Sequence, residues 1–286
     1  MIVATGLDLD QLRSWLGREE TATDLVTSDL VRKYRATLDL PPGELEEGAP
    51  APPLLHWCLS QPADATSSLG ADGHPRRGGF LPPVPLPRRM WAGGRLSFHS
   101  ELPIGRSVQR RSRIADVSIK EGRSGPLCFV VVEHEFAVDG HVILNETQDI
   151  VYRGPDAAAT EPAAQASAAP TGLHRREIDP LPPLLFRYSA LTFNGHRIHY
   201  DLPYVTVSEG YPGLVVHGPL QATLLFNFAT ELQGKTPTNF SFRSQSPLFD
   251  TGPFFLNAGQ VEGGVMKLWT ARANGPYAMT AQANWS

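Results

Sequence analysis

The feature that most constrains the fold of this chain is an internal duplication. Three short segments of the first half reappear in the second half in the same order. They are "RKYRAT" from Arg32 with "FRYSAL" from Phe186, "LLHWCL" near His56 with "VVHGPL" near His217, and "LSFHSELPIG" from Leu96 with "FSFRSQSPLF" from Phe240. One match would mean little, but three in a common order indicate a duplicated domain.

An alanine- and proline-rich segment separates the two halves. It runs from Gly154 to Gly172 as "GPDAAATEPAAQASAAPTG", and it has almost no large apolar side chain. Such a segment cannot bury a face, so it is typical of a linker. We therefore expect an N-terminal domain at residues 1–153, the linker at 154–172 and a C-terminal domain at 173–286, both domains being of ordinary size.

Each half predicts the same series of elements. A helix comes first, as in "TSDLVRKYRATL", and a second apolar helix follows, most clearly in "HGPLQATLLFNFATEL". Strands follow the helices: "RSRIADVSIKEG", "PLCFVVVEHEFAVDG" and "HVILNETQDIVYRG" in the first half, "FFLNAGQVEGG", "VMKLWTARANG" and "YAMTAQANW" in the second. The fold class is therefore α+β: a double hot-dog, with an antiparallel sheet wrapped around a central helix in each half.

Composition excludes several classes of protein. Hydrophobic residues make up 41% and charged residues 19% of the 286 residues, which is a globular balance. A net charge of −4 gives no general basic surface, so we expect no nucleic-acid partner. The start "MIVATGLDLDQLRSWLG" lacks a signal-peptide pattern, and no stretch reaches the ~18 apolar residues of a membrane span. With only Cys58 and Cys128, the chain is expected to be cytoplasmic and free of disulfides.

The segment "TFNGHRIHYD", from Thr192 to Asp201, collects two histidines, an asparagine and an aspartate. A metal site, an acid–base site and a plain polar loop would each explain it. His196 and His199 could share a metal, but no cysteine partner or HExxH pattern accompanies them, so we expect no metal. Downstream, "VVHGPL" places glycine and proline at the start of a helix, where backbone N–H groups can stabilise an anion.

The succession of "RYSALTFNGHRIHYD" and "YPGLVVHGPLQATLL" resembles the MaoC-like hydratase/dehydratase family of hot-dog enzymes. In that family a D-x-N-P-x-H loop precedes a G-x-x-x-H-G-x-L segment that opens the central helix. The likeness extends over most of the chain, because "PLPRRMWAGGRLSF" and the linker resemble a two-domain subgroup. That subgroup includes mitochondrial-type 3-hydroxyacyl-thioester dehydratases and hydratases of mesaconyl-C4-CoA and itaconyl-CoA. It implies no metal or redox cofactor, with CoA present only as part of the substrate.

The resemblance also implies roles for individual residues. His199 falls on the catalytic histidine of the family, whereas Asn194 stands where the family has its aspartate and His196 where it has asparagine. An amide cannot accept a proton as a carboxylate can, so the general base must be His199. Asn194 would position the reacting water. The Gly218 N–H would stabilise the enolate oxygen, and His217 would shape the turn or touch substrate.

A dicarboxylic acyl chain would bring a carboxylate into the pocket, and that group needs a cationic partner. The expected substrate-binding residues are Arg88, Arg89, Arg197, Arg243, His196 and His217. Because the first half has "ATLDLPPG" in place of the catalytic loop, we expect it to enclose the acyl chain without chemistry of its own. We expect His74, His141 and His174 to be surface or structural residues, and Tyr188 to lie in the core.

These observations predict a hydratase that acts on a branched C5 dicarboxylic enoyl-CoA. Itaconyl-CoA or mesaconyl-C4-CoA would give citramalyl-CoA. Since such enzymes run in both directions, a 3-hydroxyacyl-thioester dehydratase of fatty-acid type is the nearest alternative. Hot-dog proteins also include acyl-CoA thioesterases, and a non-catalytic acyl-binding module would explain the loss of the aspartate. A homodimer is a possible assembly.

Overall fold

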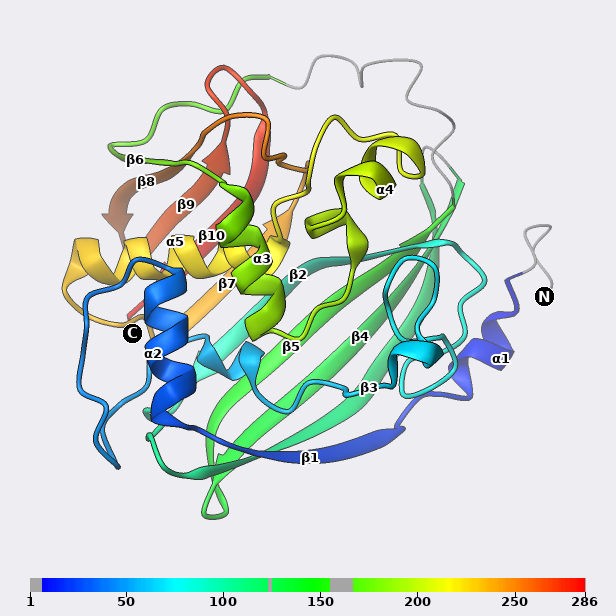
Figure 1. Ribbon diagram of the computed structural model, residues 1–286, viewed down its shortest axis with the longest axis horizontal. Coiled ribbons are helices and arrows are strands. Elements are labelled where there is room, and N and C mark those ends of the chain that lie inside the picture. The colour runs from blue at the N-terminus through cyan, green and yellow to red at the C-terminus, as the bar shows by residue number, and fades with distance from the viewer. Residues whose placement is uncertain (1–6, 123–124, 155–166, 286) are drawn as a thin grey trace.

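The computed structural model describes residues 7–122, 125–154 and 167–285, and these form one ten-stranded antiparallel sheet (Figure 1). The first half supplies, in sheet order, β1 (Glu19–Leu25), β3 (Ser107–Gly122), β4 (Gly125–Val138), β5 (His141–Arg153) and β2 (Arg88–Phe98). The second half continues with β7 (Asn239–Ser244), β10 (Tyr277–Asn284), β9 (Val265–Ala271), β8 (Phe254–Glu262) and β6 (His174–Ile178). All six predicted strands are confirmed as β3, β4, β5, β8, β9 and β10, whereas β1, β2, β6 and β7 were not among the predicted strands.

The two halves meet in the middle of the sheet, where β2 pairs with β7. Leu96 lies opposite Phe240, its equivalent in the repeated segment. A residue that pairs with its own equivalent is what a two-fold relation between the copies requires. Glycine makes this contact close, because a Cβ atom on Gly93 would lie 2.6 Å from the carbonyl oxygen of Phe242.

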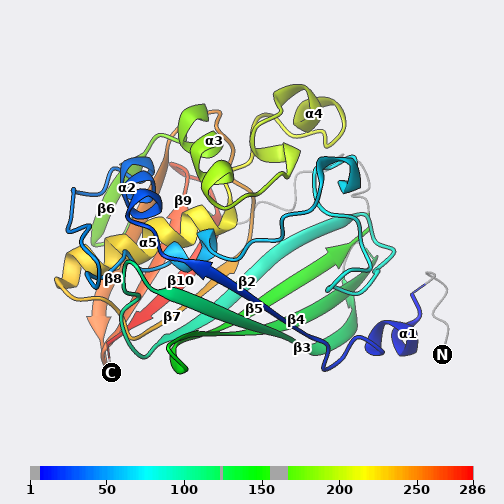
Figure 2. The same ribbon diagram turned by 60° about the horizontal axis from the view of Figure 1, so that its bottom comes forward.

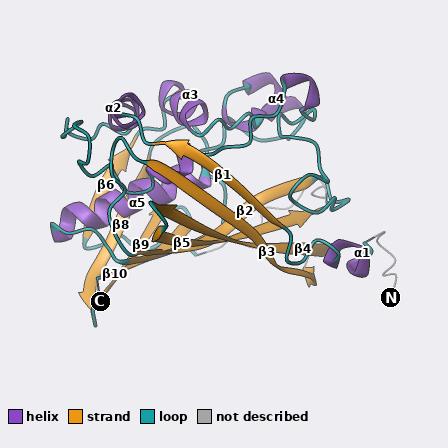
Figure 3. Ribbon diagram, turned by 90° about the horizontal axis from the view of Figure 1, so that it is seen from below, coloured by secondary structure: helices purple, strands orange, loops and turns teal. Residues whose placement is uncertain are grey.

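The long helix α5 (Gly218–Gln233) lies against the strands of the second half, and α2 (Ser28–Thr37) and α3 (Pro182–Leu191) form a layer above it (Figures 2 and 3). Helix α5 ends at Gly234, whose φ of 64° is the left-handed conformation common at helix ends. Helix α2 begins as predicted, with the Thr27 side chain accepting the Leu30 N–H. Tyr188 is buried in the core, as expected.

The first half differs at the position of the central helix. Where the second half has α5, the first has only the short 3-10 turn η1 (Leu55–Cys58). Pro62 follows closely, and the segment beyond it lacks a helical apolar pattern, so the turn does not extend. The sheet of the first half is flanked instead by α1 (Leu9–Arg13), η2 (Thr66–Ser68) and the loops around them. The second helix expected in each half is therefore present only in the second.

Both cysteines are free thiols, and Cys128 is buried. Among the helices that the structure describes, none combines the length and the apolar character needed to cross a bilayer. Most of the predicted linker, residues 155–166, lies outside the described residues, so the domain boundaries stay a prediction.

Candidate active site

His199 closes a 3-10 turn, η3 (Arg197–His199), which leads into α4 (Leu202–Val207). Two hydrogen bonds tie this turn to the segment before α5. The Val215 N–H donates to the carbonyl of Ile198 at 2.9 Å, and Nδ1 of His199 lies 2.7 Å from the Val215 carbonyl oxygen. Because a carbonyl only accepts, Nδ1 carries the proton and Nε2 keeps its lone pair. The imidazole is thus held in the tautomer that a general base requires.

Burial sets the charge of this imidazole. His199 is only 7% exposed, and the loss of hydration lowers its pKa to about 4, although the Val215 carbonyl acts in the opposite direction. The ring is therefore neutral at neutral pH. A neutral buried imidazole can take a proton from water without first losing one.

His217, immediately before α5, stacks on His199. The two ring centroids lie 3.6 Å apart with an interplanar angle of 16°. Nε2 of His217 lies 2.8 Å from the Ser189 hydroxyl on α3, and the side chain is fully buried. Burial lowers the pKa of His217 well below its usual range. This burial does not support the predicted contact with substrate, because His217 packs behind the His199 ring and orients it.

The start of α5 lies beside this pair. Its first helical hydrogen bond runs from the Gln221 N–H to the His217 carbonyl at 3.1 Å, so the N–H groups of Gly218 and Leu220 come before the helical ladder. Pro219 has no N–H. A Cβ atom on Gly218 would lie 3.5 Å from the Ser244 hydroxyl, which is ordinary contact. The helix start therefore presents backbone donors next to the base.

Asn194 shapes the loop that carries His196. The side-chain oxygen of Asn194 accepts the backbone N–H of His196 at 3.0 Å, and the backbone N–H of Asn194 donates to the Ser189 carbonyl at 2.8 Å. This fold-back follows Phe193, whose φ is 48°. It brings the His196 ring to 5.5 Å from that of His199, measured between centroids.

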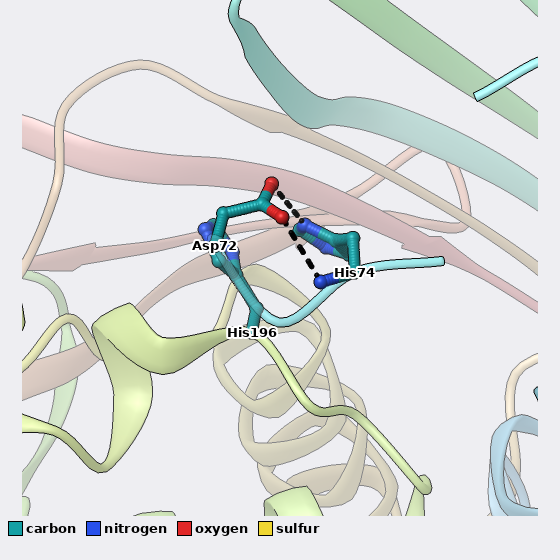
Figure 4. Close-up of side chains that lie close together, drawn as sticks. All are labelled: Asp72, His74 and His196. Carbon is teal, nitrogen blue, oxygen red and sulfur yellow. Dashed lines mark hydrogen bonds and ion pairs between the residues drawn. The ribbon is translucent and has the colours of Figure 1, made fainter. Parts of the chain in front are cut away.

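A loop from the first half reaches this same place. Asp72 and His74 lie beside His196, and the rings of His74 and His196 are 4.1 Å apart (Figure 4). Sequence reasoning missed Asp72 and placed His74 among surface or structural residues. The available signal was the triplet Asp-Gly-His within the glycine- and proline-rich "ADGHPRRGG".

One nitrogen or oxygen atom from each of Asp72, His74 and His196 lies within 4.8 Å of the others. Two imidazoles and a carboxylate are ligands that zinc and similar ions accept. Burial lowers the pKa of His74 and lowers that of His196 to about 2, and the positive charge of Arg89 acts on both imidazoles in the same direction. That positive charge also opposes the binding of a divalent metal ion at this place. The expected absence of a metal stays a prediction.

Two of the predicted substrate-binding arginines are held by protein groups. Arg197 forms an ion pair with Asp201 at 2.8 Å, donates to the Ala71 carbonyl at 2.9 Å and lies over the Tyr204 ring. Arg88 lies 3.5 Å from the Glu209 carboxylate and donates to the Tyr211 hydroxyl at 3.2 Å. Their contacts hold the loops around the site in place.

Arg243 lies on the other face of the sheet. Phe240 and Phe242 of β7 are buried on the side of α5, and strand alternation directs Arg243 outward. There it lines a groove of about 730 Å³ together with Lys267 and Trp269. The prediction that Arg243 meets substrate near His199 does not agree with this placement, because the sheet separates the two side chains.

Known structures share this fold. The MaoC-like dehydratase from Phytophthora capsici superimposes with a TM-score of 0.71 at 16% identity, over 98% of this chain and 99% of that one. A Mycobacterium tuberculosis protein described as having a double hotdog fold has a TM-score of 0.56 at 14% identity, over 94% and 95% of the two chains. The fold is therefore the double hot-dog fold of MaoC-like proteins.

Sequence comparison narrows the class further. The chain belongs to the hydroxyacyl-thioester dehydratase type 2 family, whose sequence profile matches residues 54–250. It is 47% identical to mesaconyl-C(4)-CoA hydratase of Chloroflexus aurantiacus over 245 residues, which are 86% of this chain and 88% of the relative. It is 27% identical to the mitochondrial hydroxyacyl-thioester dehydratase type 2 of Schizosaccharomyces pombe, over 70% of this chain and 75% of the relative.

Proposed function

We propose that this protein is a hydro-lyase that adds water reversibly to an α,β-unsaturated acyl-CoA. The preferred substrate is a branched C5 dicarboxylic enoyl-CoA, mesaconyl-C4-CoA or itaconyl-CoA, and the product is citramalyl-CoA. The observation that carries the proposal is the neutral His199 imidazole, fixed by the Val215 carbonyl beside the start of α5. The 47% identity to a mesaconyl-C(4)-CoA hydratase supports the substrate class.

In the proposed reaction, Nε2 of His199 takes a proton from water while the hydroxyl adds to C3 of the acyl chain. Negative charge then develops on the thioester oxygen, where the Gly218 N–H stabilises it. One such donor contributes about 3–4 kcal/mol to the transition state. The enolate collapses as His199 returns its proton to C2, and the base is regenerated. Asn194 holds the loop that carries His196, because its side-chain oxygen accepts the His196 backbone N–H.

The free carboxylate of a dicarboxylic substrate requires a cation. Arg89 is the arginine whose charge acts on His74 and His196, so it is better placed for this task than Arg243. A guanidinium pairs with a carboxylate through two parallel hydrogen bonds. We assign Arg89 to the substrate carboxylate.

The test is an assay of mesaconyl-C4-CoA and crotonyl-CoA, with mass spectrometry for the gain of one water and a parallel assay for free thiol. The wild type should hydrate mesaconyl-C4-CoA, and His199→Gln should lower kcat about 10²- to 10⁴-fold, the usual contribution of a general base. His141→Gln, at the start of β5, is the matched control and should leave kcat unchanged. Release of thiol without loss of the enoyl absorbance would identify a thioesterase and contradict the proposal.

A second candidate is dehydration of a longer 3-hydroxyacyl thioester, which the 27% identity to the mitochondrial dehydratase favours. The same groups serve both directions, because the microscopic steps are reversed. A panel of linear 3-hydroxyacyl-CoAs and citramalyl-CoA separates the two. A preference for the linear 3-hydroxyacyl-CoAs over citramalyl-CoA would favour this second function over the first.

A further inference from the structure

The loop that carries Asp72 and His74 is built onto the catalytic loop. The backbone N–H of Arg197 donates to the Asp72 carbonyl at 2.9 Å. Gly73 has a φ of +86°, and a Cβ atom there would lie 1.9 Å from the carbonyl oxygen of Gly195, so the two backbones touch directly. The first half therefore contributes a fixed wall to the site.

Asp72 orients the imidazole of His74. One carboxylate oxygen lies 3.0 Å from Nδ1 of His74, and the other accepts the backbone N–H of His74 at 3.1 Å. Burial works against ionisation of Asp72, but its bonds to His74 hold the pKa of that carboxyl well below the usual range. A carboxylate only accepts, so Nδ1 carries the proton and Nε2 of His74 keeps a lone pair. The His74 side chain remains 20% exposed, and its ring adjoins His196, which adjoins His199.

The proposed reaction requires a hydrogen-bond acceptor that His74 can provide. A reacting water has two hydrogens: one passes to His199, and the other stays on the product hydroxyl and needs an acceptor. Asn194 stands at the position of the family aspartate, but its amide oxygen already accepts the His196 N–H. An imidazole backed by a carboxylate is a stronger acceptor than an amide, because the partial positive charge it gains is stabilised by its partner.

We propose that His74, held by Asp72, is a further catalytic residue of this reaction, contributed by the first half. Its Nε2 accepts the hydrogen of the reacting water that is not transferred, so that the water lone pair faces C3. The O–H bond on the His199 side breaks, the C3–O bond forms, and the transferred proton ends on C2. Asp72 is a positioning residue. The inference rests on the hydratase function proposed above.

The experiment compares His74→Gln, His74→Ala and Asp72→Asn with wild type and His141→Gln in mesaconyl-C4-CoA hydration. His74→Gln should lower kcat about 100-fold with KM within about threefold, since the lost contact acts on water and not on the acyl chain. Added imidazole should restore part of the kcat of His74→Ala. Asp72→Asn should cost about 10-fold in kcat and move the ¹⁵N shifts of His74 towards a mixture of tautomers. All variants should still unfold in one cooperative transition, as wild type does.

Different outcomes overturn different statements. If wild type adds no water, the proposed function fails and the role of His74 fails with it. If wild type and His199→Gln behave as expected while His74→Gln keeps kcat within threefold, only the inference fails. A rise in KM at constant kcat would make His74 a substrate contact and overturn it. Loss of wild-type activity on dialysis against a chelator, restored by Zn²⁺, would make the Asp72–His74–His196 group a metal site and also overturn it.

Discussion

At the scale of single residues, the surroundings of His199 decide its chemistry. The sequence identifies the imidazole, but the Val215 carbonyl selects its tautomer, and burial keeps it neutral. His217 packs flat against it and limits its rotation. Because His199 lies beside the start of α5, we expect small changes at that start to affect the rate more than the fold.

Gly218→Ala tests whether a change at the start of α5 affects the rate more than the fold. The added methyl meets the Ser244 hydroxyl at 3.5 Å and Met279 Cε at 4.0 Å, so the fold accommodates it. The methyl keeps the thioester oxygen away from the Gly218 N–H, and kcat/KM should fall by at least about 10-fold, with a thermal midpoint close to wild type. Gly259→Ala on β8, whose Cβ would lie 3.7 Å from the Lys267 carbonyl oxygen, is the control. Equal kcat/KM for both variants would remove Gly218 from the catalytic site.

At the scale of elements, the histidine of the repeated segments "LLHWCL" and "VVHGPL" has a different role in each half. His56 of η1 corresponds to His217, yet it contacts a fully buried carboxylate on β5. Glu146 lies 3.3 Å from His56 Nε2 and accepts the Trp57 indole N–H at 2.9 Å. Burial opposes ionisation of Glu146, but these bonds hold its pKa below the usual range. In the first half, the bonds of Glu146 to His56 and Trp57 hold the short turn η1 on the sheet. In the second half, the long helix α5 packs against the sheet at the corresponding position.

Glu146→Ala should therefore destabilise the fold. Removing one member of a buried pair leaves the others without partners, and the expected loss in the free energy of unfolding is about 3–5 kcal/mol. Glu146→Gln should lose less, because its amide oxygen still accepts from Trp57. Chemical denaturation measures both, with the exposed Glu133→Ala as control. A loss below ~1 kcal/mol for Glu146→Ala would show that this group does not hold η1 on the sheet.

At the scale of the whole molecule, buried neutral histidines couple stability to pH. Burial lowers the pKa of five imidazoles in both halves, namely His74, His134, His196, His199 and His217. Below the ordinary value of ~6.5, the unfolded chain binds protons that the folded chain does not. The stabilisation is therefore complete above that pH and decreases as the pH falls towards the folded values.

We expect the thermal midpoint to be highest near pH 7.5 and to fall steadily between pH 6.5 and pH 5. Carboxylates with lowered pKa values, such as Asp201 and Glu146, act only at lower pH, so this window reports the histidines. Calorimetry at pH 7.5, 6 and 5 measures the effect, and His134→Gln should reduce the slope. A midpoint that does not change across this range would contradict the coupling.

The sequence by itself determined the repeat, six of the ten strands and the helix at Thr27, and its resemblance to the MaoC-like family identified His199 and the start of α5. The repeat, the strands and the helix depend on periodicity or spacing over a few tens of residues, and such patterns can be read along the chain. Only the tertiary structure decided that Asp72 and His74 lie beside His196, that Arg243 faces away from the site, and that His217 is buried behind His199. These outcomes depend on how distant segments pack: a loop without periodicity has no local signal for its partner, and the hydration of an imidazole is set by everything that covers it.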